Sequence, residues 1–449
     1  MVSRRRSWVL AACVLASAMA FIDGSALTVA LPNLRAFFHA ELTSAQWVLN
    51  GYVLALAALT LIGGALADVY GKARMLGIGC IGFGAASVAC IFAPSIEWLI
   101  AARLVQGVSA AVVTPSSLAL IGATYPKAER NRAIGVWAAA SALTTAGGPV
   151  LGGWLTEGFG WQWVFAINPP LALIAAALLI KFAPPDRRAY RRFDLPGAAI
   201  LACALAAFAW ALSQIGPRVV SQLSLVAGAA LFGLVASAAY AWWECVSTHP
   251  MTPPWLFGNR AFVGLNAATL LLYSGLAIMF FLVSFDLIDR RGLTPTHAGL
   301  AFLPFTLGVG LLSRLFGAVA DKIGARVMLI GGSFGAALAF LLLALGVNAR
   351  LVPGVLAPMM LLGISFAMLV APLTASVMSS VKDADEGLAS GVNNAVARIA
   401  QMAGIALAAG LASYSSGYRV SMIAAAVLAV AAAIITAAML PSPKRRRPR

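Results

Sequence analysis

Residues 64–74 read G-A-L-A-D-V-Y-G-K-A-R and form a short connection, rich in glycine and charge, between two long apolar runs. The stretch returns downstream, because residues 317–324 read G-A-V-A-D-K-I-G and repeat its pattern without a gap. Such an echo indicates two halves built alike, and parallel repeats in a membrane chain are typical of transporters that work at the interface between the halves. The repeated residues are Gly64, Ala65, Ala67, Asp68 and Gly71 in the first copy and Gly317, Ala318, Ala320, Asp321 and Gly324 in the second.

The composition is that of an integral membrane protein. Hydrophobic residues make up 61% of the 449 residues, charged residues make up only 10%, and the mean hydropathy is +0.91. Apolar runs of about 20 residues, the length that crosses about 30 Å of hydrocarbon as a helix, recur along the whole chain. The sequence therefore predicts an all-α membrane protein without a separate soluble domain.

The net charge of +16 is explained by the side of the membrane on which the basic residues lie. With the N-terminus inside the cell, 23 of the 31 Lys and Arg residues fall on cytoplasmic connections and ends, six fall outside, and two, Arg103 and Arg398, fall within helices. This bias predicts that both termini are cytoplasmic. We interpret the basic runs at residues 4–6 and 444–447 as anchors at the anionic leaflet and not as nucleic-acid contacts.

Cysteine and histidine residues give no sign of a metal or cofactor site. The five cysteines lie in or beside apolar runs without metal-ligand spacing, and the three histidines lie in connections without clustering.

The first apolar stretch is similar to a secretory signal, but Asp23 and Pro32 follow it in place of a small-residue cleavage site. We therefore expect an uncleaved first helix and no cofactor.

Breaks at proline, glycine or charge divide the apolar sequence into fourteen predicted spans. Six spans make an N-terminal bundle over residues 1–183, and six make a C-terminal bundle over residues 260–449. Between the bundles, residues 184–259 hold a basic linker and an inserted two-helix hairpin. The repeat supports this count, because Asp68 and Asp321 are 253 residues apart whereas six spans of about 20 residues with their connections occupy only about 180.

Four further stretches carry motifs: Asp23 followed by V-A-L-P at 29–32, R-x-x-Q-G at 103–107, G-P-x-x-G-G at 148–153, and W-x-W-x-F-x-I-N-x-P at 161–170. Together with the connection at 64–74, they resemble the major facilitator superfamily, and within it the fourteen-helix drug:proton antiporter branch of multidrug efflux. The resemblance covers nearly the whole chain and implies two six-helix bundles that alternate access to a midplane cavity. It also marks Gly148, Pro149, Gly152 and Gly153 as the antiporter motif of the fifth helix.

The second half departs from the pattern of that branch. Ala325 replaces the basic residue that follows the glycine of the loop motif, and the second set of membrane acids that some relatives carry is missing. This difference argues against dicationic substrates.

Asp23 is the candidate proton carrier. It lies about 15 residues, or about 22 Å of helix, into its apolar run, and no other carboxylate lies so deep. A charged carboxylate at this depth is costly unless it faces a cavity or a partner, and a proton-coupled exporter needs one such group. The alternative is a purely structural pairing with a neighbouring helix.

Arg103 is the candidate partner of Asp23, because it lies at a comparable depth in the fourth span. An arginine does not shed its proton, so its approach favours the ionised form of Asp23 and its withdrawal favours the protonated form. In the alternative interpretation, Arg103 bonds helix carbonyls and only braces the bundle.

Three further groups of residues complete the predicted machinery. The charged residues of the loop motif are predicted to form a gate latch, with its glycines permitting close helix approach; the alternative is a solvated loop. The antiporter motif is predicted to bend its helix and to allow tight packing. A substrate cavity is predicted beside the proton carrier. The residues are Gly64, Asp68, Gly71, Lys72, Arg74 and Asp321 for the latch, and Asp23, Tyr52 and Gln106 for the cavity.

The sequence therefore predicts a proton-coupled secondary exporter of lipophilic cationic or neutral drugs, and not an enzyme. The predicted partners are a small-molecule substrate, protons and the lipid bilayer of the inner (plasma) membrane, with no nucleic acid and a monomeric chain. An exporter of one endogenous metabolite or self-made antibiotic remains an alternative with the same fold. A membrane-embedded sensor or enzyme is a more distant alternative, since it would need a catalytic or metal-binding cluster that this sequence does not offer.

The orientation can be tested with single cysteines in a cysteine-free background. An impermeant thiol reagent added to intact cells should leave Ser3→Cys, Ala189→Cys and Ser442→Cys unlabelled, because all three positions are predicted to be cytoplasmic. Ala40→Cys, in the first predicted outer connection, is the positive control. Strong labelling of any of the first three would reject the orientation.

Overall fold

The computed structural model describes residues 2–185, 194–214, 223–248, 250, 252–382, 386–412 and 416–440. Within these ranges the chain is helical and includes no β-strand. Thirteen stretches are long and apolar enough to cross a membrane, and the 33-residue helix α5 brings the number of long helices to fourteen. Most of the predicted basic linker and the C-terminal basic run lie outside the described residues.

The helices follow one another with short connections. In the N-terminal part they are α1 (Val2–Phe37), α2 (Leu42–Tyr70), α3 (Lys72–Ile91), α4 (Ile96–Thr124), α5 (Lys127–Phe159), α6 (Trp163–Ala166) and α7 (Asn168–Phe182). The inserted pair is α8 (Leu195–Ser213) and α9 (Leu223–Val246). The remainder are α10 (Arg260–Phe285), α11 (Pro295–Leu300), α12 (Leu303–Ile323), α13 (Ala325–Leu345), α14 (Ala357–Ser379), α15 (Glu386–Leu411) and α16 (Gly417–Met439).

The chain divides into two compact units. Unit 1 comprises Met1–Gln214, Arg218–Met251 and Val283–Leu300, so it contains the inserted pair α8 and α9 and the short helix α11. Unit 2 comprises Ile215–Pro217, Thr252–Leu282 and Ala301–Arg449. In unit 2, α14 packs against both α12 and α13, and α13 packs against α16.

Large apolar side chains cover the outside of the helices. Ile180 is 88% exposed and Phe92 is 77% exposed, and many leucines, valines and tryptophans are more than half exposed. Exposed apolar surface on this scale is tolerated where the surrounding medium is hydrocarbon. The distribution is therefore that of a multi-pass membrane protein.

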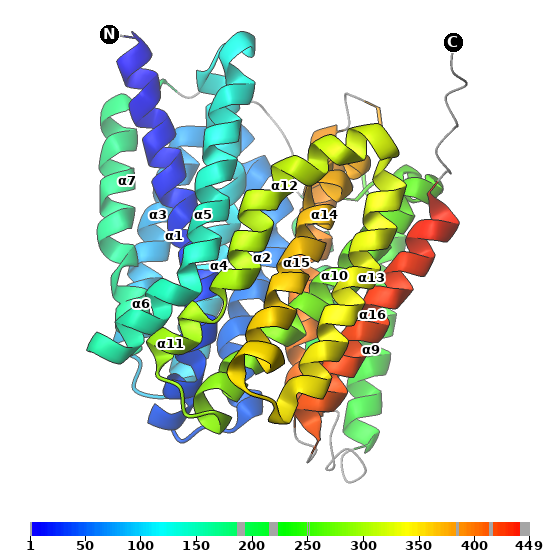
Figure 1. The fold of residues 1–449 in the computed structure, drawn as a ribbon. Helices are drawn as coiled ribbons and strands as arrows, with labels where there is room; N and C mark the ends of the chain where they lie inside the picture. Colours follow the sequence, from blue (N-terminus) through cyan, green and yellow to red (C-terminus); the bar gives the residue numbers. More distant parts are fainter. Residues whose placement is uncertain are drawn as a thin grey trace. The chain divides into compact units, whose positions relative to one another are not determined.

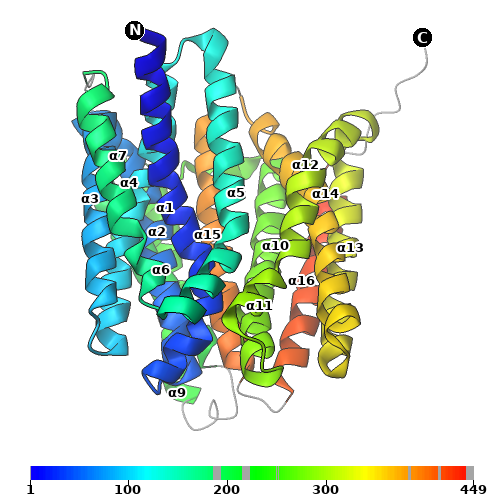
Figure 2. The ribbon, with the colours of Figure 1, turned by 60° about the vertical axis from the view of Figure 1, so that its left-hand side comes forward.

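Glycines set the packing of unit 1 around α1. This helix packs between α5 and α7, as Figures 1 and 2 both show. A Cβ atom on Gly148 would overlap the side chain of Ser25, and one on Gly152 would overlap the carbonyl oxygen of Ala26. Only glycine lets the backbones of α1 and α5 approach so closely at these two positions.

The opposite side of the same motif holds α11. A Cβ atom on Gly153 would overlap the carbonyl oxygen of Pro295, and one on Gly299 would overlap that of Pro149. Next to this contact, a carboxylate oxygen of Glu157 accepts the backbone N–H of Thr296 at 3.0 Å. Hydrogen bonds from the side chains of Thr296 and Thr294 lower the pKa of Glu157. The antiporter motif thus joins α5 to α1 on one side and to α11 on the other.

The sequence repeat has a counterpart in the backbone. Gly71 has a φ of 105° and Gly324 has a φ of 96°, and each ends one long helix and starts the next. This left-handed region of φ favours glycine over any other residue. The two loop motifs therefore form the same turn in the two units.

Replacement of Gly152 by alanine tests the packing of α5. Gly152→Ala should lower the melting temperature of the purified protein in detergent by a few degrees, because its methyl group meets the backbone of α1. Gly147→Ala is the matched control in the same helix, since a Cβ there meets nothing within 4 Å. Equal melting temperatures for the two variants would contradict the packing described above.

Candidate functional site

Asp23 of α1 lies at the centre of a buried polar cluster in unit 1. Its side chain has no solvent exposure. One carboxylate oxygen, Oδ2, forms an ion pair with Nη1 of Arg103. The other, Oδ1, accepts hydrogen bonds from Nε2 of Gln106 and from Nδ2 of Asn168, both at 3.0 Å. Both oxygens of the carboxylate are therefore occupied by protein donors.

Arg103 of α4 is held on several sides. Its Nε donates to the carbonyl oxygen of Val48 in α2 at 2.9 Å, and its Nη1 also donates to Gln106 Oε1. The guanidinium lies over the ring of Tyr52 with its Cζ atom 4.3 Å from the ring centroid. These contacts combine charge pairing, hydrogen bonding and cation–π attraction. The guanidinium thus contacts both Asp23 and a helix carbonyl, and its part in proton coupling stays a prediction.

Two residues of the cluster had no assigned role in the sequence analysis. Asn168 starts α7, and Ser87 lies on α3, where its hydroxyl accepts hydrogen bonds from Gln106 at 2.8 Å and from Asn168 at 3.2 Å. Asn168 belongs to the motif at 161–170, and an amide within an apolar run was the only available signal. Ser87 had no signal, because a serine in a membrane helix commonly bonds its own helix, as Ser87 also does to Phe83.

Helix geometry brings the cluster together. A Cβ atom on Gly107 of α4 would overlap the carbonyl oxygen of Tyr52 in α2, so glycine lets the two helices approach and places Arg103 over the Tyr52 ring. Tyr52 in turn donates a long hydrogen bond of 3.4 Å to the carbonyl oxygen of Ala20 in α1. Four long helices and the start of α7 therefore converge on one carboxylate.

The predicted cavity residues are all buried in this cluster. Asp23 and Gln106 have no exposure and Tyr52 is 4% exposed, so these side chains bind one another and offer no open surface. Their part in a substrate cavity stays a prediction.

The loop motif lies at the junction of α2 and α3. Nζ of Lys72 is 3.8 Å from Oδ1 of Asp68, and both side chains are about one third exposed. A partly exposed pair of this kind contributes little to stability. Gly64 and Gly317 occupy matching places in the two units, facing Pro115 and Ala371 at ordinary contact distance. The latch function predicted for the motif, including Asp321, stays a prediction.

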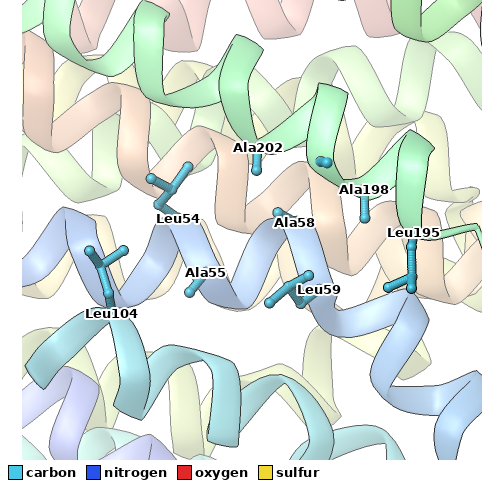
Figure 3. A pocket seen from close by; sticks show the side chains of 9 residues that line it. Leu54, Ala55, Ala58, Leu59, Leu104, Leu195, Ala198 and Ala202 are labelled. Atoms are coloured by element: carbon cyan, nitrogen blue, oxygen red, sulfur yellow. The ribbon is translucent and has the colours of Figure 1, made fainter. Parts of the chain in front are cut away.

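A separate cavity of about 440 Å³ lies between α2, α4 and α8 (Figure 3). Its walls are leucine and alanine side chains, so it offers apolar contact and has no side chain that could hold a charge or a proton. It shares no lining residue with the Asp23 cluster. The lining residues are Leu54, Ala55, Ala58, Leu59, Leu104, Leu195, Ala198, Ala199 and Ala202.

A double-mutant cycle measures the buried ion pair. Asp23→Asn and Arg103→Gln should each destabilise unit 1 by about 3–5 kcal/mol, because each leaves an uncompensated buried charge. The double variant should cost clearly less than the sum of the two. The measurement is denaturant unfolding of purified protein in detergent micelles.

The exposed pair of Arg35 and Asp289, 3.5 Å apart and also in unit 1, is the matched control. The cycle of Arg35→Gln and Asp289→Asn should give a coupling energy below about 1 kcal/mol. Equal coupling energies for the two pairs would show that the Asp23 pair is not desolvated.

Residues 13–242 and 265–449 match the Major Facilitator Superfamily. The multidrug resistance protein Stp of Mycobacterium tuberculosis (strain CDC 1551 / Oshkosh) is 34% identical over 395 residues, which are 87% of this chain and 72% of that protein. The lincomycin resistance protein of Streptomyces lincolnensis is 32% identical over 390 residues, which are 86% of this chain and 80% of that protein.

Among solved structures, an auto-inhibited peptide transporter of the POT family has a TM-score of 0.69 over 99% of both chains. Its sequence identity is only 15%, so this likeness shows the fold alone. The family match, the sequence relatives and the long apolar helices all indicate a multi-pass membrane transporter. The chain belongs to the Major Facilitator Superfamily, in which it is a multi-pass drug-efflux transporter and not an enzyme.

Proposed function

We propose that the protein exports lipophilic drugs in exchange for protons and that Asp23 carries the proton. The observation that supports this proposal is the Asp23 cluster, in which one deeply buried carboxylate is paired with a cation on another helix. An ionisable residue inside a membrane span is rare because its charge is costly there, and such residues commonly serve function. The expected energy source is the proton gradient, and the protein needs no cofactor.

The contacts of Asp23 suggest how a proton would be coupled to helix movement. Protonation removes the charge that holds Arg103 of α4, while the amides of Gln106 and Asn168 still have an oxygen to bond. The ion pair between α1 and α4 would then be weaker, and a conformation that separates the two residues would become more populated. Release of the proton would restore the pair and the starting conformation.

The sequence suggested lipophilic cations and neutral molecules as substrates, and the two kinds place different demands on this site. A cation would have to displace Arg103 from Asp23, because both carboxylate oxygens already have donors. A neutral substrate would need Asp23 only for coupling. The name of one relative refers to multidrug resistance, and that favours a broad range of substrates.

A narrower range is the second candidate. Another relative of similar identity is named for resistance to a single antibiotic, lincomycin. An exporter of one metabolite or self-made antibiotic would share the fold and the proton site, so only a substrate panel separates the two. In either case we place the protein in the inner (plasma) membrane as a monomer, with both termini cytoplasmic.

Transport by inside-out vesicles tests the proton site. Wild-type protein should accumulate ethidium, a monovalent cation, and chloramphenicol, a neutral drug, when the vesicle interior is acidified, and an uncoupler should stop both. Asp23→Asn should reduce gradient-driven accumulation of both to the level of vesicles without the protein, because the side chain no longer exchanges a proton. Asp23→Glu should restore part of the activity with a shifted pH dependence.

The matched control is Glu97→Gln, which removes an exposed carboxylate at the start of α4. It should transport at the wild-type rate. If Asp23→Asn still concentrates either drug against a pH gradient, the proton carrier lies elsewhere and the proposal fails.

A further inference from the structure

Helix α15 of unit 2 carries a polar stripe along about two turns in the middle of its membrane-spanning length. Asn394, Arg398 and Gln401 follow one another at spacings of four and three residues, which place them on one face of the helix, and Asn393 lies beside this face. The rest of the stretch Leu388–Leu411 is apolar enough to span a membrane. A polar stripe of this length within hydrocarbon indicates a face that meets water, a ligand or a polar partner.

Arg398 lies at the middle of the helix. It follows Glu386 by 12 residues and precedes Leu411 by 13, so it is about 18–20 Å of helix from either end. The side chain of an arginine is too short to carry its charge from there to a headgroup region, although it can do so near helix ends. The charge of Arg398 therefore stays near the bilayer midplane.

Asn393, beside the stripe, is bonded to α10. Nδ2 of Asn393 donates to Asn266 Oδ1 at 3.1 Å and to Thr269 Oγ1 at 2.8 Å, and the Ser274 hydroxyl donates to the carbonyl oxygen of Ala400 at 3.0 Å. These bonds fix α15 against α10. Beyond them the stripe is open, because Asn394 is exposed, and Arg398 and Gln401 are partly exposed.

The guanidinium of Arg398 has few described polar partners within unit 2. Its Nη1 donates to Oε1 of Gln401 at 3.3 Å. Among the side chains that the structure describes, no carboxylate pairs with it. In the sequence of unit 2 the acidic residues are Asp321, Asp383, Asp385 and Glu386, and each lies at least 12 residues from Arg398 along the chain.

Arg103 gives a comparison, because it is a buried arginine with several polar partners and an aromatic ring contact. It has no solvent exposure and combines a carboxylate, a backbone carbonyl and the ring of Tyr52. Arg398 has an amide in place of the carboxylate and keeps part of its surface open. A guanidinium has five N–H donors in a planar fork, so most of those of Arg398 remain available for a further acceptor.

We propose that Arg398, with Gln401 beside it, binds an acidic group of the transported molecule. The fork of a guanidinium matches the two oxygens of a carboxylate, and the pair would neutralise a charge at midplane depth that no carboxylate among the described side chains pairs with. The subsite therefore extends the substrates of the exporter to amphipathic molecules with a carboxylate or an equally acidic oxygen, either anions or zwitterions. A lipid headgroup does not fit this site, because headgroups lie at the bilayer surface. The proposal rests on the proposed function, since it names the substrate of that exporter.

A matched pair of dyes tests the subsite by binding alone. Rhodamine 110 has a free carboxylate, and rhodamine 123 is its methyl ester with the same ring system. Purified wild-type protein, in detergent at one pH and without a gradient, should bind rhodamine 110 at least about tenfold more tightly, the ratio that one charge-assisted contact provides. Arg398→Gln should bring the two affinities within about twofold and leave that for rhodamine 123 unchanged. Arg398→Lys, which keeps the charge but loses the fork, should retain part of the preference.

Arg314→Gln is the matched control, because it removes the same charge from α12 of the same unit, nine residues before the end of that helix. It should keep the wild-type preference. The proposal is overturned if wild-type protein binds both dyes equally, if folded Arg398→Gln keeps the preference, or if Arg314→Gln alone abolishes it. Because no proton gradient enters this assay, failure of proton coupling in vesicles and failure of the subsite are separate results.

Discussion

The ion pair between Asp23 and Arg103 is the interaction on which the rest of unit 1 depends. Removing both charges from water costs several kcal/mol per ion, and their attraction offsets this only when the remaining polar atoms are also satisfied. Gln106, Asn168 and the carbonyl of Val48 supply those contacts from three further places in the chain. The glycines at 107, 148 and 152 follow from the same requirement, since they allow α1, α2, α4 and α5 to approach closely. The pair is favourable only in this arrangement, so a change at Asp23 acts on several helices together.

The sequence predicted those parts of this arrangement that follow from a regular spacing or a recognisable motif along the chain. Span length, the repeated loop with its glycine turns and the depth of Asp23 all follow from spacing along one chain. The contact of Asp23 with Arg103 could be anticipated because both lie at similar depth. The roles of Asn168 and Ser87 could not, because a single amide or hydroxyl can satisfy itself within its own helix. The attachment of α11 to α5 was also unpredictable, since it depends on backbone approach between residues about 140 positions apart.

Arg103 and Arg398, two of the arginines inside the spans, have different surroundings in the two units. Each places a permanent positive charge in a region where a charge is energetically costly. The partners that compensate this charge differ between the two units. In unit 1 a carboxylate on the neighbouring helix neutralises Arg103 and excludes solvent. In unit 2 the described partner of Arg398 is the neutral amide of Gln401, and among the described side chains no carboxylate pairs with it. The asymmetry between the units is therefore one of charge compensation, within a repeated backbone design.

This asymmetry has an electrical consequence for antiport. Exchange of one inward proton for one outward monovalent cation moves no net charge, so only the pH gradient drives it. Exchange for a neutral molecule moves one charge inward and gains about 2.3 kcal/mol for each 100 mV of membrane potential. Exchange for a monoanion moves two charges in the favourable direction and gains about 4.6 kcal/mol for the same potential. A midplane arginine that selects acidic substrates would thus let a cell with a negative interior use its membrane potential most fully, with a single carboxylate as the proton carrier.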